Sequence, residues 1–158
     1  MWRVFFLVPF LVAACVRDET ISAYAEKNAI YELIEINNMV VSSLATIQFP
    51  SKGKVTGQGP CNRFNAKQSA PYPWINLSLI ESTELACPKL TDERQYFESL
   101  GKMTLAEVSG DVLILSNDEG DQMVFQTRRQ RVRTSRNLAR TGGKGRLPKA
   151  GAKAFSRK

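Results

Sequence analysis

The sequence predicts an α+β protein, mainly an antiparallel β sheet closed into a barrel-like shape, with one inserted helix at about residues 91–100. Short segments alternate apolar and polar side chains, which is typical of strands with one buried face. The turns between these segments are only a few residues long, as antiparallel neighbours require. There is neither an internal repeat nor a βαβ pattern. A chain of 158 residues with 43% hydrophobic side chains is expected to form one domain with a substantial core.

Four strands are expected in the first half of the body. IYELIEIN (30–37) alternates in polarity and leads into a turn at Asn37-Asn38. VVSSLATIQF (40–49) is its expected partner, and KVTGQG (54–59) is a shorter third strand that runs into a glycine-rich loop. WINLSLI (74–80) also alternates, so we expect one of its faces to be buried.

The single helix is expected in TDERQYFESLG (91–101). Thr91 is a suitable N-cap, and Asp92 and Glu93 follow in the first turn, where the helix dipole favours negative charge. Gly101 suits the left-handed position that ends a helix. Three more strands follow as a meander, with short turns between them, in 103–108, 112–116 and 123–126.

The amino terminus resembles an export signal. Residues 1–14 combine Arg3 with an apolar run of 11 residues and end in small side chains, which predicts a signal peptide and is too short for a membrane-spanning helix of about 20 residues. LVAAC resembles a bacterial lipobox, so Cys15 is the expected lipidation site. Simple cleavage after VAA and a retained anchor are the alternatives. Val16, rather than aspartate, favours the outer membrane, with the protein facing the periplasm.

Charge divides the rest of the chain. Residues 15–28 are polar and predict a tether, with a brief helix at 21–26 as the alternative. Residues 128–158 hold twelve Lys and Arg and no Asp or Glu, so the first 127 residues keep ten basic and fifteen acidic side chains, a net charge of −5. The body at 29–127 is therefore acidic. The basic tail has few large apolar residues and is expected to be disordered.

The basic tail has a restricted set of expected partners. Anionic lipid or cell-wall polymer would attract it, and the alternative is an appendage that binds nothing. Export would separate the tail from nucleic acid, so no nucleic-acid partner is expected.

The absence of histidine excludes several classes of site. The count of His is zero, so there is no Ser-His-Asp triad, no Cys-His pair and no histidine-bearing zinc site. Three cysteines cannot complete a four-cysteine zinc site, and the acidic residues at 118–121 lack EF-hand spacing. No metal or cofactor is expected.

Cysteine parity suggests a covalent link. With Cys15 assigned to lipid, Cys61 and Cys87 remain, and an even remainder in an exported chain favours a disulfide. Closing a loop of this length should stabilise the fold by roughly 3–4 kcal/mol. Two separate buried thiols and a reactive Cys61 thiolate, with its pKa lowered by Arg63, are the alternatives.

The loop GQGPCNRFN (57–65) has two interpretations. In the structural one, Asn62 and Asn65 bond the loop backbone, and Arg63 pairs with a glutamate, Glu81 or Glu84. In the functional one, Asn62, Arg63, Asn65 and Thr83 form a small binding face.

The segment SAPYPW (69–74) also admits two interpretations. We expect its aromatic rings to pack over a sheet end, and the alternative is partner recognition through exposed rings.

Three blocks together resemble one family: GQGPCNRFNA (57–66), ESTELACPKLTDERQYFESLGKM (81–103) and VSGDVLILSNDEGDQMVF (108–125). They are similar to the META-domain family, the HslJ-like bacterial envelope lipoproteins, over about residues 30–126. The resemblance implies a small antiparallel sheet or barrel-like α+β domain. The chain departs from the family pattern at Tyr31, where tryptophan is frequent, and at Glu84, where arginine is common.

The resemblance also implies a function. It predicts a non-enzymatic, lipid-anchored envelope protein with a structural or binding role in envelope stress or antibiotic tolerance. The alternative is a thiol-dependent enzyme or redox protein of the envelope that uses Cys61. Neither interpretation identifies a protein partner.

Overall fold

The structure, a computed structural model, describes residues 17–140. The expected signal peptide and lipidation site lie outside these residues, as does the tail beyond Arg140. The elements in order are η1 Ile21–Ala23, β1 Tyr31–Ile36, β2 Met39–Val40, β3 Thr46–Ser51, β4 Lys54–Gln58, β5 Arg63–Gln68, β6 Leu77–Ser82, α1 Leu90–Lys102, β7 Leu105–Ser109, β8 Val112–Ser116, β9 Gln122–Thr127 and α2 Arg128–Arg140.

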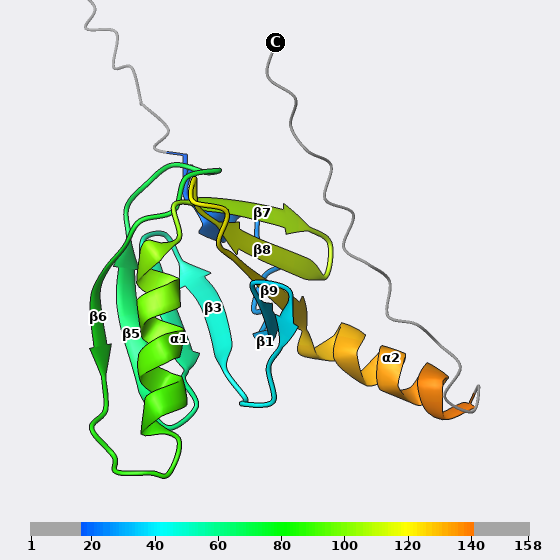
Figure 1. The fold of residues 1–158 in the computed structure, drawn as a ribbon. Helices are drawn as coiled ribbons and strands as arrows, with labels where there is room; N and C mark the ends of the chain where they lie inside the picture. Colours follow the sequence, from blue (N-terminus) through cyan, green and yellow to red (C-terminus); the bar gives the residue numbers. More distant parts are fainter. Residues whose placement is uncertain (1–16, 141–158) are drawn as a thin grey trace, which may run out of the picture.

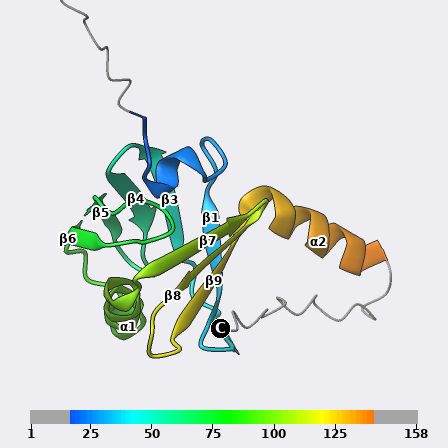
Figure 2. The same cartoon turned by 90° about the horizontal axis from the view of Figure 1, so that it is seen from above.

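The strands form one antiparallel sheet that curves into a half-barrel. Its strand order is β6-β5-β4-β3-β1-β9-β8-β7, and β2 pairs with β1 away from this path. Helix α1 lies across the open side of the curve, and α2 projects away from the body (Figures 1 and 2). This arrangement confirms the α+β class and the meander at the carboxyl end of the domain.

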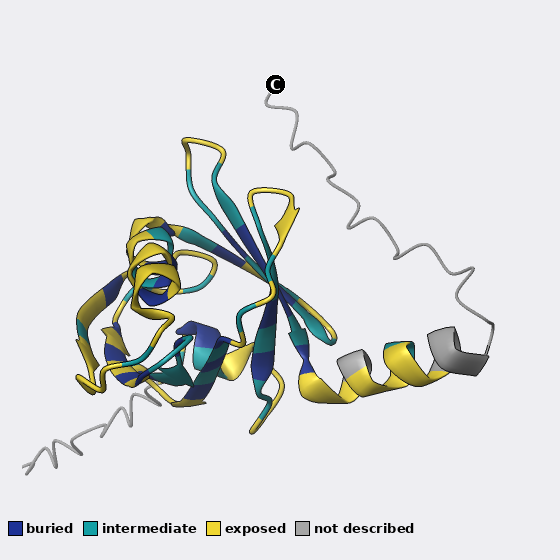
Figure 3. Ribbon diagram, turned by 60° about the horizontal axis from the view of Figure 1, so that its bottom comes forward, coloured by how far each residue is buried: buried dark blue, intermediate teal, exposed yellow. Residues whose placement is uncertain are grey.

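The core lies between the sheet and α1, and strand periodicity explains its composition. In β5, exposed and buried residues alternate strictly, with Phe64, Ala66 and Gln68 buried. Phe64 meets Tyr96 of α1 edge to face, with the ring centres 6.0 Å apart. Burial is concentrated on the inner surface of the half-barrel, whereas α2 is mostly exposed (Figure 3). Phe64 is 1% exposed and lies in this core.

Two predicted strands differ in their extent. The segment 40–49 is split into β2 and β3. Val41 N–H still donates to the Ile34 carbonyl at 3.1 Å and the Ala45 carbonyl accepts the Leu33 N–H at 2.9 Å, so the chain leaves the sheet only between these two residues. Asn37 and Asn38 both have positive φ, 49° and 63°, as this tight hairpin turn requires.

The strand predicted at 74–80 begins later, at Leu77, and runs to Ser82. Ile75 and Leu77 are buried, but Leu79 is 61% exposed. The reason is a change in register: Leu79 has a φ of 50°, and the pairing of β5 with β6 shifts between Asn65 and Lys67. This irregularity turns Leu79 out of the alternation.

Helix α1 is longer than predicted, and its caps differ. Thr91 lies within the helix, whose N-cap is Lys89 without a side-chain cap bond. The helix passes through Gly101 and ends at Lys102, so Gly101 is not a left-handed stop. Lys89 is the N-cap because its carbonyl accepts the first hydrogen bond of the helix, from the Glu93 N–H at 3.0 Å.

The expected tether is largely part of the body. Ile21 is 1% exposed and belongs to the core, and Thr20 is 6% exposed. Asp18 organises this segment, because its carboxylate accepts hydrogen bonds from Thr20 N–H, Thr20 Oγ1 and Ser22 Oγ. The short helix η1 lies within the alternative range of 21–26. The composition of the segment did not predict this packing, because Ile21 is its only large apolar residue in the core.

The basic region does not begin as disordered chain. Its first thirteen residues form α2, which continues directly from β9. Arg128 fixes the first turn: its N–H donates to the Ile30 carbonyl at 3.0 Å, and its Nε bonds Glu32 at 2.7 Å. Arginine also has a high helix propensity. The prediction of disorder rested on charge and on the small number of apolar residues, and it did not take this propensity into account.

Candidate functional site

The glycine-rich loop between β4 and β5 is covalently connected to the segment before α1. Cys61 and Cys87 are disulfide-bonded in the structure, with their Cα atoms 6.1 Å apart and a sequence separation of 26. Cys61 follows the turn at Pro60, and Cys87 lies three residues before Leu90, where α1 begins. The sulfur atoms of Cys61 and Cys87 therefore join the β4–β5 loop to the segment that precedes α1.

A buried carboxylate occupies the centre of this loop. Glu93 of α1 is 5% exposed, and its Oε2 accepts the N–H groups of Cys61 at 2.9 Å and Asn62 at 2.5 Å. Its Oε1 accepts Asn62 Nδ2 at 2.6 Å. A buried carboxylate needs such donors to offset the loss of its hydration.

Asn62 connects that carboxylate to the Cys87 side of the site. Its Oδ1 accepts Thr83 Oγ1 and the Leu85 N–H, each at 2.8 Å, and its Nδ2 also donates to the Leu85 carbonyl at 3.3 Å. Asn62 is 2% exposed. Within residues 17–140, no buried side-chain nitrogen or oxygen lacks a hydrogen-bond partner. The amide of Asn62 is therefore fully used by the fold.

Two glycines make room for this network. A Cβ on Gly59 would lie 2.8 Å from Glu93 Oε2 and 3.2 Å from the Phe97 ring. A Cβ on Gly57 would lie 2.1 Å from the Thr46 carbonyl oxygen and 2.4 Å from the Phe64 ring. Glycine is needed at both positions because of this close approach, and not because of a left-handed backbone.

The structure divides the four residues of the predicted binding face into two pairs. Asn62 and Thr83 bond each other within the loop network. Arg63 and Asn65 point away from it on the exposed side of β5. The sequence therefore indicated the right segment but did not separate its two faces.

Arg63 and Asn65 border a shallow polar hollow outside β3, β4 and β5, together with Gln48, Thr56 and Gln58. The ion pairs among the described residues are Arg128–Glu32 and Arg129–Glu26, so the expected pairing of Arg63 with Glu81 or Glu84 is absent there. Arg63 is thus a solvent-exposed cation beside hydrogen-bonding groups.

The buried role of Glu93 is not predicted from the sequence, because its negative charge alone already explains a position in the first helical turn. Its spacing carried a further signal, because Glu93, Tyr96 and Leu100 lie three and seven residues apart, on the face that α1 buries. A charged residue at a core-facing position indicates a buried partner, but it does not identify that partner.

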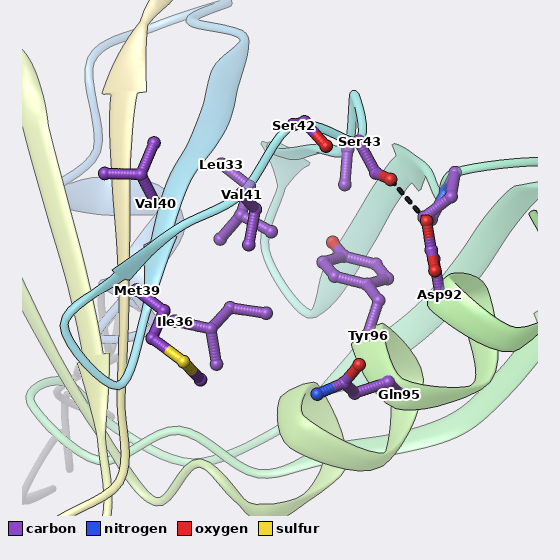
Figure 4. A pocket seen from close by; sticks show the side chains of 12 residues that line it. Leu33, Ile36, Met39, Val40, Val41, Ser42, Ser43, Asp92, Gln95 and Tyr96 are labelled. Atoms are coloured by element: carbon purple, nitrogen blue, oxygen red, sulfur yellow. Dashed lines mark hydrogen bonds between the residues drawn. The ribbon is translucent and has the colours of Figure 1, made fainter.

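An apolar cleft of about 220 Å³ separates the β1–β2 hairpin from the first turns of α1. Its walls include Leu33, Ile36, Val41 and Tyr96 (Figure 4). The cleft lies where the chain turns away from the sheet between Val41 and Ala45. Ser43 Oγ donates to Asp92 at 2.6 Å and connects the two sides of the cleft.

Tyr31 and Tyr96 are buried, and burial makes their hydroxyl groups weaker acids. Burial raises the pKa of Tyr96, and the same effect raises the pKa of Tyr31. Tyr31 accepts a hydrogen bond from the Glu26 N–H at 3.1 Å. The hydroxyls of both residues therefore remain protonated at neutral pH.

In the segment 69–74 one aromatic ring is packed, as expected, and the other is exposed. Tyr72 stacks on Tyr24, with ring centres 4.2 Å apart, and its hydroxyl accepts the Val108 N–H at 3.3 Å. Trp74, in contrast, is 57% exposed and bridges to Leu105 through its backbone. The bond between Tyr72 and Pro73 is cis.

Residues 17–140 contain neither a cluster of possible metal ligands nor a helix that could span a membrane. Their Cys, Asp and Glu side chains form no group of three or more that is arranged to hold a metal ion. Neither of their α-helices has the length and apolar character needed to cross a bilayer.

Comparison with known proteins gives a family and a fold. The structure is similar to an NMR structure of a protein from Burkholderia xenovorans, with 17% identity and a TM-score of 0.53, over 68% of this chain and 86% of that one. A second NMR structure is 18% identical with a TM-score of 0.50, over 63% and 89% of the two chains. At these identities the likeness shows the fold alone. A comparison with curated protein sequences finds no match. A family model described as the META domain matches residues 26–130, which is more than half of the sequence, and the chain therefore belongs to the META-domain family.

Proposed function

We propose that this chain is a lipid-anchored, non-enzymatic protein of the bacterial envelope that acts by binding. The observation that carries the proposal is the use of the loop residues by the fold. Asn62 and Glu93 hydrogen-bond each other, Glu93 also accepts hydrogen bonds from the loop backbone, and Cys61 is disulfide-bonded to Cys87. No free thiolate remains at the motif, and with a His count of zero a general base of the usual kind is missing too.

The anchor in this proposal is Cys15. Five residue steps separate it from Thr20, which is buried, so the connection spans at most about 18 Å. The domain would therefore sit close to the membrane rather than on a long tether. Val16 after the lipidated cysteine supports the outer membrane, with the domain on the periplasmic side.

The apolar cleft is the best-supported binding site. Its apolar walls, with Ser43, Asp92 and Gln95 among the lining residues, have the composition of a small-ligand site. We propose that it takes a small apolar ligand whose polar end meets Ser43 and Asp92. A role in envelope stress or antibiotic tolerance, as the family resemblance implies, would follow from binding such a compound.

The basic region supplies a second contact in this proposal. Val132, Arg133 and Arg136 of α2 are exposed, and the helix contacts the body mainly through β9. Because the region carries no acidic residue, its field favours an anionic lipid or wall polymer.

Two measurements test the proposal. Mass spectrometry of the processed protein without reductant should show an acylated Cys15 and two alkylation-resistant sulfurs. Metabolic palmitate labelling should disappear in Cys15→Ala. A protein that keeps Met1 and carries no acyl group would contradict the anchor, and alkylation of Cys61 without reductant would contradict the disulfide-bonded, non-catalytic assignment.

The cleft is tested separately with 1-anilinonaphthalene-8-sulfonate as an apolar probe. Val41→Asp places a charge on the cleft wall and should weaken probe binding at least five-fold. Leu79→Asp is the matched control, because Leu79 is exposed on β6 and is not among the residues lining the cleft. Equal binding by the two variants, each with a native unfolding transition, would exclude the cleft.

A further inference from the structure

Exposed aromatic side chains gather where the described chain begins. Trp74 is 57% exposed and Tyr24 is 52% exposed, so both rings present apolar surface to solvent. Tyr24 stacks on Tyr72 at an interplanar angle of 17°. This stacking holds the Tyr24 ring at the surface instead of leaving it mobile.

Hydrogen bonds hold these aromatic residues beside the amino-terminal segment. The Tyr72 N–H donates to the Glu19 carbonyl at 2.7 Å. Buried Gln68 donates through Nε2 to the Trp74 carbonyl at 3.3 Å, and its N–H donates to the Gly53 carbonyl at 3.0 Å. The connection between β5 and β6, which contains Tyr72 and Trp74, therefore lies against both the first described residues and the β3–β4 turn. Figure 1 shows this connection at the end of the molecule where the chain emerges toward its amino terminus.

Four cations lie around the same end. Lys52 Nζ donates to the Arg17 carbonyl at 3.5 Å. Lys54 and Lys67 are directly opposite each other on β4 and β5. The four exposed cationic side chains are Arg17, Lys52, Lys54 and Lys67. Two like charges in direct cross-strand register are unfavourable for the sheet alone, so an anionic surface would relieve them.

The nearby carboxylates offset only part of this charge. Asp18 accepts hydrogen bonds from Thr20 and Ser22 and keeps its negative charge near Lys52, whereas Glu26 pairs with Arg129 at 3.8 Å. Glu19 is the exposed carboxylate of the entering segment. Cations and amphipathic rings thus occur together, as they do on surfaces that contact lipid headgroups.

We propose that this amino-terminal face, formed by Arg17, Tyr24, Lys52, Lys54, Lys67, Tyr72 and Trp74, rests on the headgroup layer of an anionic phospholipid bilayer. The inference depends on the proposed lipid anchor, because Cys15 lies only two residues before Arg17 and would hold this face at the membrane. Trp74 then occupies the interface, where its ring is in apolar surroundings and its N–H remains hydrated.

This orientation directs the cleft away from the membrane. The first turns of α1, which line the cleft, lie at the opposite end of the molecule from the emerging amino terminus (Figure 1). The cleft therefore opens toward the periplasm. One molecule then has a lipid-facing end and a ligand-facing end.

Tryptophan fluorescence tests this orientation directly. The chain has two tryptophans, Trp2 and Trp74, and removal of residues 1–14 leaves Trp74 alone. The processed, acylated protein is reconstituted into phosphatidylglycerol–phosphatidylethanolamine vesicles that contain lipids brominated near the headgroup. We expect Trp74 emission to shift to shorter wavelength and to be quenched at least two-fold.

A matched variant reports on the opposite end. Trp74→Phe combined with Val40→Trp moves the fluorophore to the hairpin, where Val40 is 75% exposed. We expect its emission to be unaffected by the brominated lipid. Lys52→Gln, Lys54→Gln and Lys67→Gln together should reduce the quenching of Trp74 by half or more on these vesicles.

The outcomes separate this inference from the proposed anchor. Protein that does not sediment with the vesicles overturns both. Protein that sediments but leaves Trp74 unquenched, or that is quenched equally at positions 40 and 74, overturns the orientation and leaves the anchor intact. Quenching at Trp74 that is unchanged by the triple lysine substitution overturns the electrostatic part of the proposal.

Discussion

The carboxylate of Glu93 in α1 accepts hydrogen bonds from both the main-chain N–H and the side-chain amide of Asn62 in the β4–β5 loop. Glu93 Oε2 accepts the Asn62 N–H at 2.5 Å, and Oε1 accepts Asn62 Nδ2 at 2.6 Å. The two residues are 5% and 2% exposed. This contact joins the helix to the sheet at the point where Cys61 and Cys87 also join them, so the non-covalent and covalent connections support the same loop.

Glu93→Gln should destabilise the fold by about 2–3 kcal/mol, because an amide accepts through one oxygen only and turns its NH₂ toward buried donors. Glu98→Gln, on the exposed side of the same helix, makes the same chemical change and should have little effect. Urea unfolding monitored by circular dichroism measures both. Equal stabilities would mean that the buried carboxylate is not a central contact.

Gly57→Ala should cost at least about 3 kcal/mol, because the new Cβ would overlap the Thr46 carbonyl, which belongs to a paired strand and cannot move alone. Gly101→Ala is the opposite case. Gly101 lies inside α1 with no atom near its added Cβ, so the change should stabilise the protein by about 0.5–1 kcal/mol. Thermal unfolding of the two variants should shift in opposite directions.

Removal of the disulfide by Cys61→Ser with Cys87→Ser should lower the free energy of unfolding by roughly 3–4 kcal/mol. The same loss should appear when the unsubstituted protein is unfolded in the presence of a reductant, and the double variant should be insensitive to that reductant. A double variant that still responds to reductant would show that another sulfur pairing contributes.

Acid should loosen the amino-terminal segment through Asp18. Burial acts to raise the pKa of Asp18, but hydrogen bonds from Ser22 and Thr20 lower it below its ordinary value of 3.8. A depressed folded-state pKa stabilises the segment fully above the unfolded value, and that contribution is lost as pH falls through the folded pKa. Amide exchange at residues 20–25 should therefore accelerate below about pH 3.8, beyond its intrinsic pH dependence. In Asp18→Asn the segment should exchange faster at neutral pH and show no such transition.

The basic helix can be tested with a soluble polyanion, which avoids the contribution of the lipid anchor. Arg133→Gln with Arg136→Gln should weaken binding to dextran sulfate several-fold in titration calorimetry. Arg94→Gln with Lys102→Gln removes the same net charge from exposed positions on α1 and should have a smaller effect. An equal loss in both variants would show that only net charge matters.

Much of this fold could be read from local patterns. Several features depend only on neighbours within one element, and each appears in the structure. They are the alternation at 30–36 and 112–116, the turn at Asn37-Asn38 and the helical spacing from Tyr96 to Leu100. The interruption at 41–45 and the exposed Leu79 could not be read in this way. Both depend on how adjacent strands shift in register, and this shift is decided by residues of other strands.

The sequence by itself determined the strand and helix pattern, the pairing possibilities of the cysteines and the split between an acidic body and a basic end. Only the tertiary structure decided that Asn62 faces a buried carboxylate while Arg63, the next residue, faces solvent. Periodicity within a strand shows that neighbours point to opposite faces, but it does not show which face is covered. That depends on Glu93, thirty-one residues away along the chain, whose charge could be buried only where the loop supplies donors to offset the loss of water.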